Sequence, residues 1–532
     1  MSLPGVESGV LDLETEIPAP MAIVQPIETA PGARRRLALK SPSTLEPLGE
    51  IEVQNSDDVG QALEQARKAQ PAWAALPVEE RVRVLERALK RVIERQDEIV
   101  ATVIAETGKA QSEALSMEVF ASCDVLSYYA KRAVRFLRPE KRRLHGMLRF
   151  LKKLQVVYRP LGVVGVITPW NGPFILSMNP TVQALVAGNA VLLKPSEITP
   201  ASGALAAEIL NDAGLPEGVL QVLTGDGETG AALCEAGVDK VCFTGSVETG
   251  RKVATACAGQ LIPCTLELGG KDPMIVCADA DLDSAAGGAL AGAYMNTGQY
   301  CCGTERVYVV DEVADAFTDK VVERAAALRQ GASGEFDVGA IFWDRQMDVI
   351  ERHMTDARER GASVRVGGRR NPELAGLYYE PTVLTDVDHD MLIMKEETFG
   401  PVLPIMRVRD EEEALRLAND TRYGLSATVW SQDAYKAHEL AKRIESGGVC
   451  INDMTVTYGC PEAPFGGLKE SGVGQVNGES GLKSYCHAMP IISDRFGGKQ
   501  SRGFYPYSAK KDAGLKRVIA LVFDGPLRRF LG

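Results

Sequence analysis

The sequence predicts an α/β protein with two parallel sheets, and three observations lead to that prediction. The 532 residues exceed the length of one usual domain, so two or three domains are expected. Between residues 163 and 257, short apolar runs alternate with helical stretches. A second alternating block extends from Pro273 to about Asn452. Alternation at this spacing is typical of a parallel sheet covered by helices on both faces.

The elements of the first block follow from their residues. Short uninterrupted apolar runs are typical of strands that are buried on both faces. They predict strands at 163–167, 190–193, 219–223 and 240–243, with helices at 201–211 and 250–257. Upstream, residues 57–127 are expected to be helical, because apolar residues repeat every three or four positions. The repeat is clearest at Val82, Leu85, Leu89 and Val92.

The two ends of the chain and one internal stretch differ from these blocks. Residues 1–45 are rich in Pro, Glu and Ala and predict a flexible arm. The stretch from Lys131 to Arg159 carries eleven Lys or Arg residues against one acid, Glu140. The tail from Lys499 to Gly532 carries eight against Asp512 and Asp524. Both basic segments stand out in a chain whose net charge is -12.

Composition excludes several classes of protein. The acidic balance argues against nucleic acid as the main partner. Eleven Cys residues without C-x-x-C spacing predict neither a disulfide scaffold nor a structural zinc site, and no metal is expected. Residues 1–30 lack the pattern of a signal peptide, and no apolar run reaches about eighteen residues. We therefore expect a cytoplasmic protein.

Three residues carry candidate chemistry. Cys301 is a candidate nucleophile, Glu267 a candidate base and Asn171 a candidate oxyanion donor, the three groups that acyl chemistry requires. Taken singly, Cys301 is also compatible with a buried structural thiol, and Glu267 with an ion-pair partner. None of the five His residues is near these positions, so neither a Cys–His pair nor a zinc site is supported.

Three motifs suggest nucleotide binding, each with a structural alternative. Residues 225–230 form a literal G-x-G-x-x-G, which is either a dinucleotide fingerprint or a tight turn. Residues 243–250 follow an apolar run and open a helix, where Gly245 permits close approach and Ser246 either binds phosphate or caps the helix. In residues 194–197, Lys194 and Glu197 either bind ribose oxygens or form a solvated turn.

Together these residues resemble the aldehyde dehydrogenase superfamily over roughly residues 45 to 495. The resemblance depends on seven motifs in the family's order, which are Pro169–Phe174, Lys194–Glu197, Phe243–Gly250, Leu266–Lys271, Gly298–Arg306, Glu396–Pro401 and Pro464–Gly472. It implies that Cys301, and not Cys302, is the nucleophile. It also implies that Glu267 is the general base and that Asn171 binds the oxyanion.

The resemblance further implies a cofactor site and a domain plan. The implied cofactor-binding residues are Thr168, Pro169, Trp170, Lys194, Glu197, Gly230, Phe243, Gly245, Ser246, Leu268, Glu397 and Phe399. The run containing Ser246 is expected to face the pyrophosphate, in preference to the literal fingerprint at Gly225. The expected plan is a Rossmann-like cofactor domain (46–138 and 161–266), a catalytic domain (267–455), a small β oligomerisation element (139–160 and 486–500) and a tail (501–532).

The cofactor and substrate are expected as follows. A carboxylate at position 197 favours NAD, because it would repel the 2′-phosphate of NADP, with NADP as the alternative. The implied substrate lining is Phe174, Leu176, Met178 and Tyr458, which favours a medium-chain or aromatic aldehyde. The motif wording is closest to bacterial succinate-semialdehyde dehydrogenases, so that activity is the first alternative. A CoA-acylating enzyme and an inactive NAD-binding scaffold are further alternatives, against which Glu267 and the intact triad argue.

Assembly and the tail complete the expectations. The resemblance implies a homodimer or homotetramer, assembled through a hairpin near residues 140–159. In the tail, apolar residues share one helical face and lie beside basic ones; they are Leu515, Val518, Ile519, Val522 and Phe523, with a second cluster at Leu527, Phe530 and Leu531. Such a face either packs against protein or contacts a membrane surface peripherally.

Overall fold

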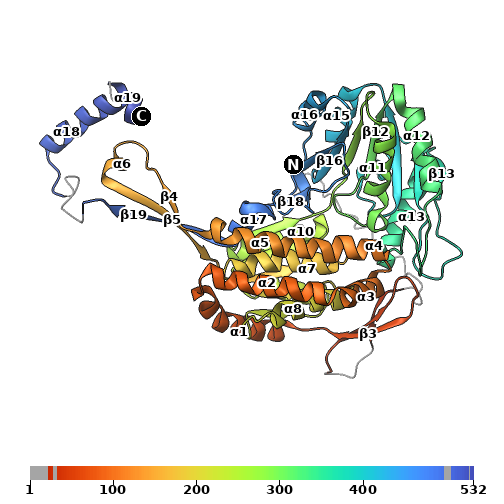
Figure 1. Cartoon of the computed structure of the whole chain (residues 1–532), viewed down its shortest axis with the longest axis horizontal. Helices are drawn as coiled ribbons and strands as arrows, with labels where there is room; N and C mark the ends of the chain where they lie inside the picture. The colour runs from red at the N-terminus through yellow and green to blue at the C-terminus, as the bar shows by residue number, and fades with distance from the viewer. Residues whose placement is uncertain (1–21, 28–32, 497–504, 526–527, 532) are drawn as a thin grey trace, which may run out of the picture.

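The structure is a computed structural model that describes residues 22–27, 33–496, 505–525 and 528–531. Two α/β domains lie side by side, and a narrow extension projects away from them (Figure 1). Within the described residues each domain contains one mainly parallel sheet. The predicted α/β class with two sheets is therefore confirmed.

The sheet of the first domain has the strand order β18-β10-β9-β6-β7-β8. Its neighbours are parallel except β18, which is antiparallel to β10. The strands are β6 (Val163–Ile167), β7 (Ala190–Lys194), β8 (Leu220–Val222), β9 (Lys240–Thr244), β10 (Cys264–Glu267) and β18 (Gly472–Val473). Every residue of β6 and β7 is buried, as expected for strands covered on both faces.

Helices cover both faces of this sheet. One apolar core joins the sheet to α7 (Pro173–Val186) and α8 (Pro200–Asp212), with further helices outside them. These outer helices are α2 (Val78–Glu94), α3 (Gln96–Thr107), α4 (Gln111–Glu113), η2 (Ala114–Phe120), α5 (Ala121–Leu137) and α17 (Gly478–Lys483). The other core joins the opposite face to α1 (Ser56–Ala75), α9 (Gly227–Glu235) and α10 (Val247–Gln260).

The sheet of the second domain has the order β13-β14-β15-β12-β11-β16-β17. Its strands are β11 (Pro273–Val276), β12 (Arg306–Val310), β13 (Ser363–Val366), β14 (Thr382–Thr385), β15 (Val402–Val408), β16 (Ser426–Trp430) and β17 (Gly448–Ile451). One face packs on α11 (Leu282–Tyr294) and α12 (Asp311–Ala326). The other packs on α13 (Asp344–Glu359), α14 (Leu392–Lys395), α15 (Glu411–Asn419) and α16 (Ala434–Ala441). Short 3-10 turns are η3 (Met295–Gly298) and η4 (Lys469–Ser471).

The expected flexible arm requires a correction. Residues 24–27 and 36–40 form β1 (Val24–Ile27) and β2 (Arg36–Lys40), and β2 pairs on one side with β1 and on the other with β3 (Pro47–Glu52). Leu37 and Leu39 of β2 point inward and are buried. Ile23 is 1% exposed in the core of the second domain, where its backbone N–H donates to Asp344. The segment is ordered because it buries these apolar side chains; the rest of the expected arm, residues 1–21 and 28–32, lies outside the described residues.

The projecting extension is a three-stranded sheet followed by the tail (Figure 1). The strands are β4 (Glu140–Arg142), β5 (Lys152–Pro160) and β19 (Cys486–Asp494), and α6 (Leu148–Leu151) lies in the hairpin between β4 and β5. The tail forms α18 (Ala509–Ile519), η5 (Ala520–Asp524) and α19 (Arg528–Leu531). Among the described residues, no helix is long and apolar enough to span a bilayer.

Candidate functional site

One pocket of about 590 Å³ is lined by residues of both domains. All three candidate catalytic residues line it, so the fold brings together Asn171, Glu267 and Cys301 from distant parts of the sequence. Seven predicted cofactor residues line it too: Pro169, Trp170, Gly245, Ser246, Leu268, Glu397 and Phe399. The arrangement places a thiol, a carboxylate and an amide at the wall of one cavity.

Strand topology explains the convergence. The strands β6, β9 and β10 are adjacent and parallel, so their carboxyl ends lie at the same edge of the sheet. Asn171 follows β6, Ser246 follows β9, and Glu267 is the last residue of β10. Ligands of open parallel sheets bind outside this edge. The pocket therefore occupies the position that the sheet topology predicts.

Two glycines allow the close backbone contacts of the site. A Cβ atom at Gly270 would lie 2.9 Å from the carbonyl oxygen of Cys301, nearer than real Cβ contacts allow. Gly298 has a φ of +73°, and a Cβ there would lie 2.2 Å from the carbonyl oxygen of Gly400. The glycines of both motifs are thus needed to bring the loop that carries Cys301 against its neighbours.

The Asn171 side chain is held from several directions. Its Nδ2 donates to the Gln299 carbonyl oxygen at 3.0 Å, which leaves its second N–H available. The backbone carbonyl oxygen of Asn171 accepts from Asn296 Nδ2 at 2.8 Å and from Lys109 Nζ at 3.2 Å. Gln299 in turn accepts from Phe342 N at 2.8 Å. This network fixes the amide beside the loop of Cys301.

The two adjacent cysteines occupy different environments. Cys301 is half-buried and lines the pocket, whereas Cys302 is fully buried in an apolar cluster with Leu425, Phe465 and Val476. The pKa of the Cys301 thiol lies well above its usual range because of a hydrogen bond with the Cys302 thiol and because of burial. Only Cys301 is placed to meet a ligand in the pocket.

Glu267 is a buried carboxyl without a hydrogen-bond partner. Its side chain is 4% exposed, and both of its carboxyl oxygens lack a partner among the described residues. Burial, followed by the nearby Cys301, raises its pKa well above the usual range. A base with a raised pKa holds a proton more strongly once it has accepted one, which suits proton transfer near neutral pH.

A fully buried ion pair supports the side of the pocket that carries Asn171. Lys109 Nζ and Glu118 Oε1 lie 2.6 Å apart, and both side chains are 0% exposed. Glu118 Oε2 also accepts from the backbone N–H groups of Phe174 and Ile175, in the first turn of α7. Because Lys109 also donates to Asn171, the pair connects the start of α7 to the loop that carries the amide.

A second buried pair supports the opposite side. Lys271 Nζ lies 2.5 Å from Glu305 Oε2. The Glu305 carboxylate accepts from the backbone N–H groups of Thr398 and Phe399. Phe399 is held at a φ of +49°, which a non-glycine residue rarely adopts. The pair therefore fixes the loop that presents Phe399 and Glu397 to the pocket.

The pocket has features that fit a dinucleotide. Gly245 has no side chain at the pocket wall, and the first turn of α10, capped by Ser246, opens there. A helix N-terminus of this kind attracts phosphate. Trp170 packs edge-on against Phe399 with ring centroids 5.4 Å apart and against Trp343 at 6.3 Å, which provides flat apolar walls. Burial raises the pKa of Glu397 to about 8.

Other predicted cofactor residues lie outside the lining of this pocket. Lys194 and Glu197 form an ion pair of 3.1 Å at the end of β7. Thr168 is buried against Ser177. Phe243 is buried on β9, and Gly230 lies on α9.

None of the four predicted substrate residues is among the residues that line this pocket. Phe174 and Met178 are fully buried, and Leu176 is 7% exposed. Tyr458 accepts from Asn179 Nδ2 at 3.1 Å and packs edge-on against Phe465.

Several lining residues were not predicted from the sequence. Four of them surround the start of α13, and three come from other helices and loops; they are Trp343, Gln346, Val349, Arg352, Arg251, Arg422 and Tyr423. No short motif marks them, because α13 reaches the pocket only through packing of the two domains. A conspicuous Trp beside a helix start is the one local signal.

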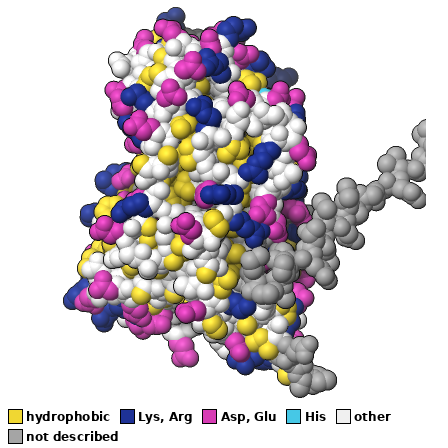
Figure 2. Space-filling view, turned by 90° about the vertical axis from the view of Figure 1, so that its right-hand side faces the viewer, with side chains coloured by type: hydrophobic (Ala, Val, Ile, Leu, Met, Phe, Trp, Pro, Cys, Tyr) yellow, Lys and Arg dark blue, Asp and Glu magenta, His cyan; other side chains and the backbone are white. Residues whose placement is uncertain are grey.

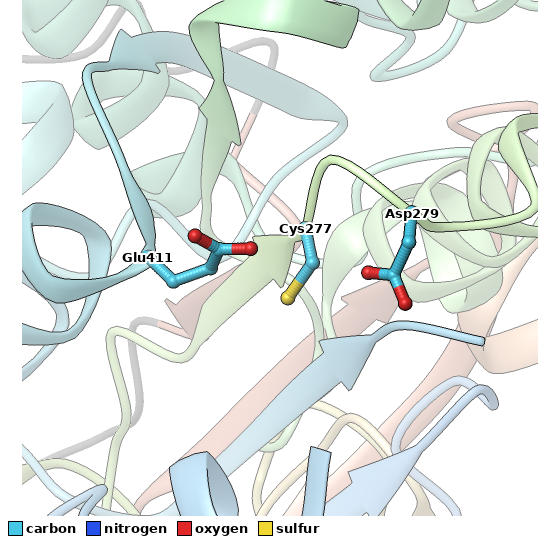
Figure 3. Close-up of side chains that lie close together, drawn as sticks. All are labelled: Cys277, Asp279 and Glu411. Carbon is cyan, nitrogen blue, oxygen red and sulfur yellow. The ribbon is translucent and has the colours of Figure 1, made fainter. Parts of the chain in front are cut away.

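A second cluster of polar side chains lies away from this pocket. Cys277, Asp279 and Glu411 lie close enough to hold a metal ion and point toward one another (Figure 3). Lys436 Nζ, however, lies 2.6 Å from Asp279 and 3.1 Å from Glu411. Burial raises the pKa of Cys277 to about 12, so its thiol keeps its proton. The lysine already supplies the positive charge that these carboxylates need.

Fold and site together define a two-domain enzyme with a thiol and a carboxyl in a dinucleotide-type pocket. The sequence profile of the aldehyde dehydrogenase family matches residues 29–491, and the chain belongs to this family. It is accordingly an NAD(P)-dependent aldehyde oxidoreductase.

Known relatives agree with the family. The chain is 39% identical to a 4,4'-diapolycopene aldehyde oxidase of a Methylomonas species, over 93% of each chain. It is also 39% identical to a putative succinate-semialdehyde dehydrogenase [NADP(+)] of Mycolicibacterium smegmatis, over 87% of this chain and 90% of the relative. An NAD+-complexed aldehyde dehydrogenase of Mycobacterium tuberculosis aligns with a TM-score of 0.83 and 33% identity, over 90% of this chain and 98% of that one.

Proposed function

We propose that this chain oxidises an apolar aldehyde to a carboxylic acid with NAD, through a covalent intermediate on Cys301. The observation that carries the proposal is the placement of Cys301, Asn171 and the unpartnered carboxyl of Glu267 at one pocket. A thiol, an amide donor and a base are the groups that form and hydrolyse a thioester. The same three groups argue against an inactive scaffold.

In the first step, the Cys301 thiolate attacks the aldehyde carbon. The raised pKa of the thiol means that the resting group is protonated, so it must lose its proton before it attacks. The ionised carboxylate of Glu267, at the same pocket, takes this proton and passes it to solvent before the second step. The oxygen of the former carbonyl becomes an oxyanion. It can accept from the free N–H of Asn171 and from the backbone N–H of Cys301.

In the second step, the intermediate is oxidised and hydrolysed. When bound, NAD would supply the hydride acceptor that this oxidation requires, and Cys301 would then hold the acyl group as a thioester. The residues that would hold NAD are Ser246 with the first turn of α10, Glu397 and Phe399. Glu267 then takes a proton from water, and the resulting hydroxide attacks the thioester carbon. The C–S bond breaks, which releases the acid and the Cys301 thiolate. Water is favoured over CoA because this base is present and its raised pKa suits proton transfer.

NAD is favoured over NADP by Glu197. Lys194 lies 3.1 Å from this carboxylate, whose side chain is 28% exposed and can therefore be reached by a ligand. A carboxylate accepts a hydrogen bond from a ribose hydroxyl and repels a ribose phosphate. Glu197→Gln is therefore expected to reduce the preference for NAD, measured as kcat/KM with NAD divided by kcat/KM with NADP.

An apolar substrate is favoured by the residues around Tyr458. The whole of α7, which includes the predicted lining, is buried and contains no charged side chain. Acidic side chains lie close to one another nearby. The pKa of Asp124 is raised first by burial and then by the charge of Glu462. The pKa of Cys460 is raised first by burial and then by the charges of Glu462 and Asp124. We propose that substrates approach the pocket past these acidic side chains, which would repel an aldehyde with its own carboxylate. The names of the two relatives differ on the substrate, since one is named for 4,4'-diapolycopene aldehyde and the other for succinate semialdehyde.

The substrate class can be tested by comparing hexanal with succinate semialdehyde. We expect a higher kcat/KM for hexanal, measured through absorbance of the reduced cofactor, with Cys301→Ala as the inactive control. Removing the acidic groups with Asp124→Asn and Glu462→Gln should raise kcat/KM for succinate semialdehyde severalfold and leave hexanal unchanged. Glu439→Gln, an exposed change on α16, is the matched control. A strong preference of the unmodified enzyme for the semialdehyde would contradict the proposal.

A further inference from the structure

The end of the extension combines apolar and basic side chains on its surface. In and beside α6, four large apolar side chains are 43–55% exposed; they are Met147, Leu148, Phe150 and Leu151. On α18 and η5, four more are 48–60% exposed; they are Leu515, Ile519, Leu521 and Phe523. We call these two groups, with the basic residues between them, the tip surface. Single exposed apolar residues are ordinary, whereas a gathered set marks a binding surface.

The tip surface is also strongly basic. A hollow of about 610 Å³ beside α6 is lined by seven Lys or Arg residues, namely Lys141, Arg142, Arg143, Arg149, Lys152, Lys153 and Arg495. Of these, Arg142 pairs with Glu140, and Lys152 pairs with Asp494. On α18, Lys516 and Arg517 lie between the exposed Leu515 and Ile519. The rest of the chain is acidic enough to give a net charge of -12.

The two groups adjoin each other at the end of the molecule. A further hollow is lined by His145 of the hairpin together with Phe523, Arg528 and Arg529 of the tail. Figure 1 shows α6, α18 and α19 at the far end of the extension, away from both domains. On the face of the two domains shown in Figure 2, by contrast, acidic and basic side chains are interspersed. A flat surface could therefore reach the tip without meeting the domains.

We infer that the tip surface binds the surface of an anionic phospholipid bilayer. Apolar side chains flanked by Lys and Arg insert shallowly among acyl chains, while the cations meet lipid phosphates. A bilayer surface accepts Lys and Arg alike, whereas the centres of protein interfaces favour Arg and are depleted of Lys, and Lys141, Lys153 and Lys516 belong to the tip surface. The contact is peripheral, since none of the described helices can span a bilayer. Leu527 lies outside the described residues, as do the side chains of Phe530 and Leu531.

The test is co-sedimentation of the full chain with vesicles. We expect binding to vesicles of equal parts phosphatidylcholine and phosphatidylglycerol, weaker binding in high salt, and none to phosphatidylcholine alone. The variant K516E/R517E should reduce the partition coefficient roughly tenfold or more, because each basic residue contributes about fivefold near an anionic surface. The variant L515D/I519D should also lower it, since it removes the inserting side chains.

Matched controls are K90E and I93D, which change an exposed cation and an exposed apolar residue on α2 (side chain of Lys90 78% exposed, Ile93 53% exposed). Both should bind vesicles like the unmodified chain. All variants should keep activity on hexanal, which shows that they fold. No binding to anionic vesicles by the unmodified chain would overturn the inference. The inference would also be overturned if L515D/I519D bound vesicles normally but had a smaller oligomeric mass in solution, because a second copy of the chain would then be the occupant of the tip surface. The assay needs no aldehyde, so its outcome is independent of the proposed reaction.

Discussion

The two sides of the pocket use the same device for different purposes. On the first-domain side, the buried pair Lys109–Glu118 holds Asn171 and the start of α7. On the second-domain side, the buried pair Lys271–Glu305 holds the loop of Phe399 and Glu397. In both, a glutamate accepts from two successive backbone N–H groups of a loop or helix start. Under the proposed mechanism, one side therefore positions the group that meets the reacting carbonyl, while the other positions the cofactor.

A buried pair is a costly way to fix a loop, which points to positioning as its purpose. Removing two charges from water opposes folding, and apolar replacements of both partners are often neutral or stabilising. Each carboxylate here is satisfied by backbone donors that an apolar residue could not satisfy. The pairs therefore serve loop geometry more than stability.

The largest effect is expected from the reacting thiol, between the two sides. Cys301→Ala should lower kcat by at least about 10³-fold, as loss of a nucleophile does in other covalent enzymes. Cys302→Ala should keep most activity, because its thiol faces an apolar cluster and not the pocket. Turnover of hexanal measures both. If Cys302→Ala were inactive and Cys301→Ala active, Cys302 would be the nucleophile instead.

The next effect is expected from the first-domain side. Asn171→Ala should lower kcat by about 10²–10³-fold with little change in KM for NAD, because the amide acts on the oxyanion. Steady-state kinetics with NAD and hexanal varied in turn will separate the two parameters. A change confined to KM for NAD would show that Asn171 serves the cofactor instead.

The two ion pairs give the sharpest comparison. Lys109→Met should lower kcat by roughly tenfold or more through displacement of Asn171, whereas Lys271→Met should mainly raise KM for NAD through displacement of Phe399. Each change strands a buried glutamate and should reduce the free energy of unfolding by about 3–5 kcal/mol.

The double variants K109M/E118Q and K271M/E305Q are the controls for stability. They should recover much of the stability and little of the kinetic defect, because the positioning of the loops would still be lost. Equal kinetic effects from the two sides would refute the division of roles. Thermal unfolding and steady-state kinetics on the same samples measure both properties.

The smallest effect concerns pH and the second-domain side. The pKa of Glu397 is about 8 in the folded chain, above the ordinary 4.5, so the folded state keeps a proton that the unfolded state loses between these values. Stability from this group is full below about 4.5 and is lost as pH rises toward 8. Glu397→Gln should therefore gain stability relative to the unmodified chain as pH rises.

The gain can be measured as the difference in Tm at pH 5, 6.5 and 8. The corresponding gain in the free energy of unfolding should be less than about 1.4 kcal/mol per pH unit. It stays below that limit because Glu397 is only half-buried and water in the pocket screens its charge. Glu439→Gln, on the surface of α16, is the control and should give a constant difference. A gain that shrinks with pH would mean that Glu397 is stabilised as a carboxylate.

Much of the fold was readable from local pattern. The expected strand 163–167 coincides with β6, and the other three expected strands agree with β7, β8 and β9 within a residue at either end. Continuous apolar runs determine such strands, because a parallel sheet buries both faces. The strands β1 and β2 were not predicted, because their few inward-facing residues are informative only beside the second domain.

The sequence by itself determined the α/β class, the family and the set Cys301, Glu267 and Asn171, because seven ordered motifs carry that information locally. Tertiary structure alone decided which cysteine faces the pocket, which residues of α13 line it and which ion pairs hold its two sides. These depend on contacts between residues far apart in the chain, such as Lys109 with Asn171. Burial, which only the folded chain creates, also decided that Glu267 and Cys301 hold their protons more strongly than usual.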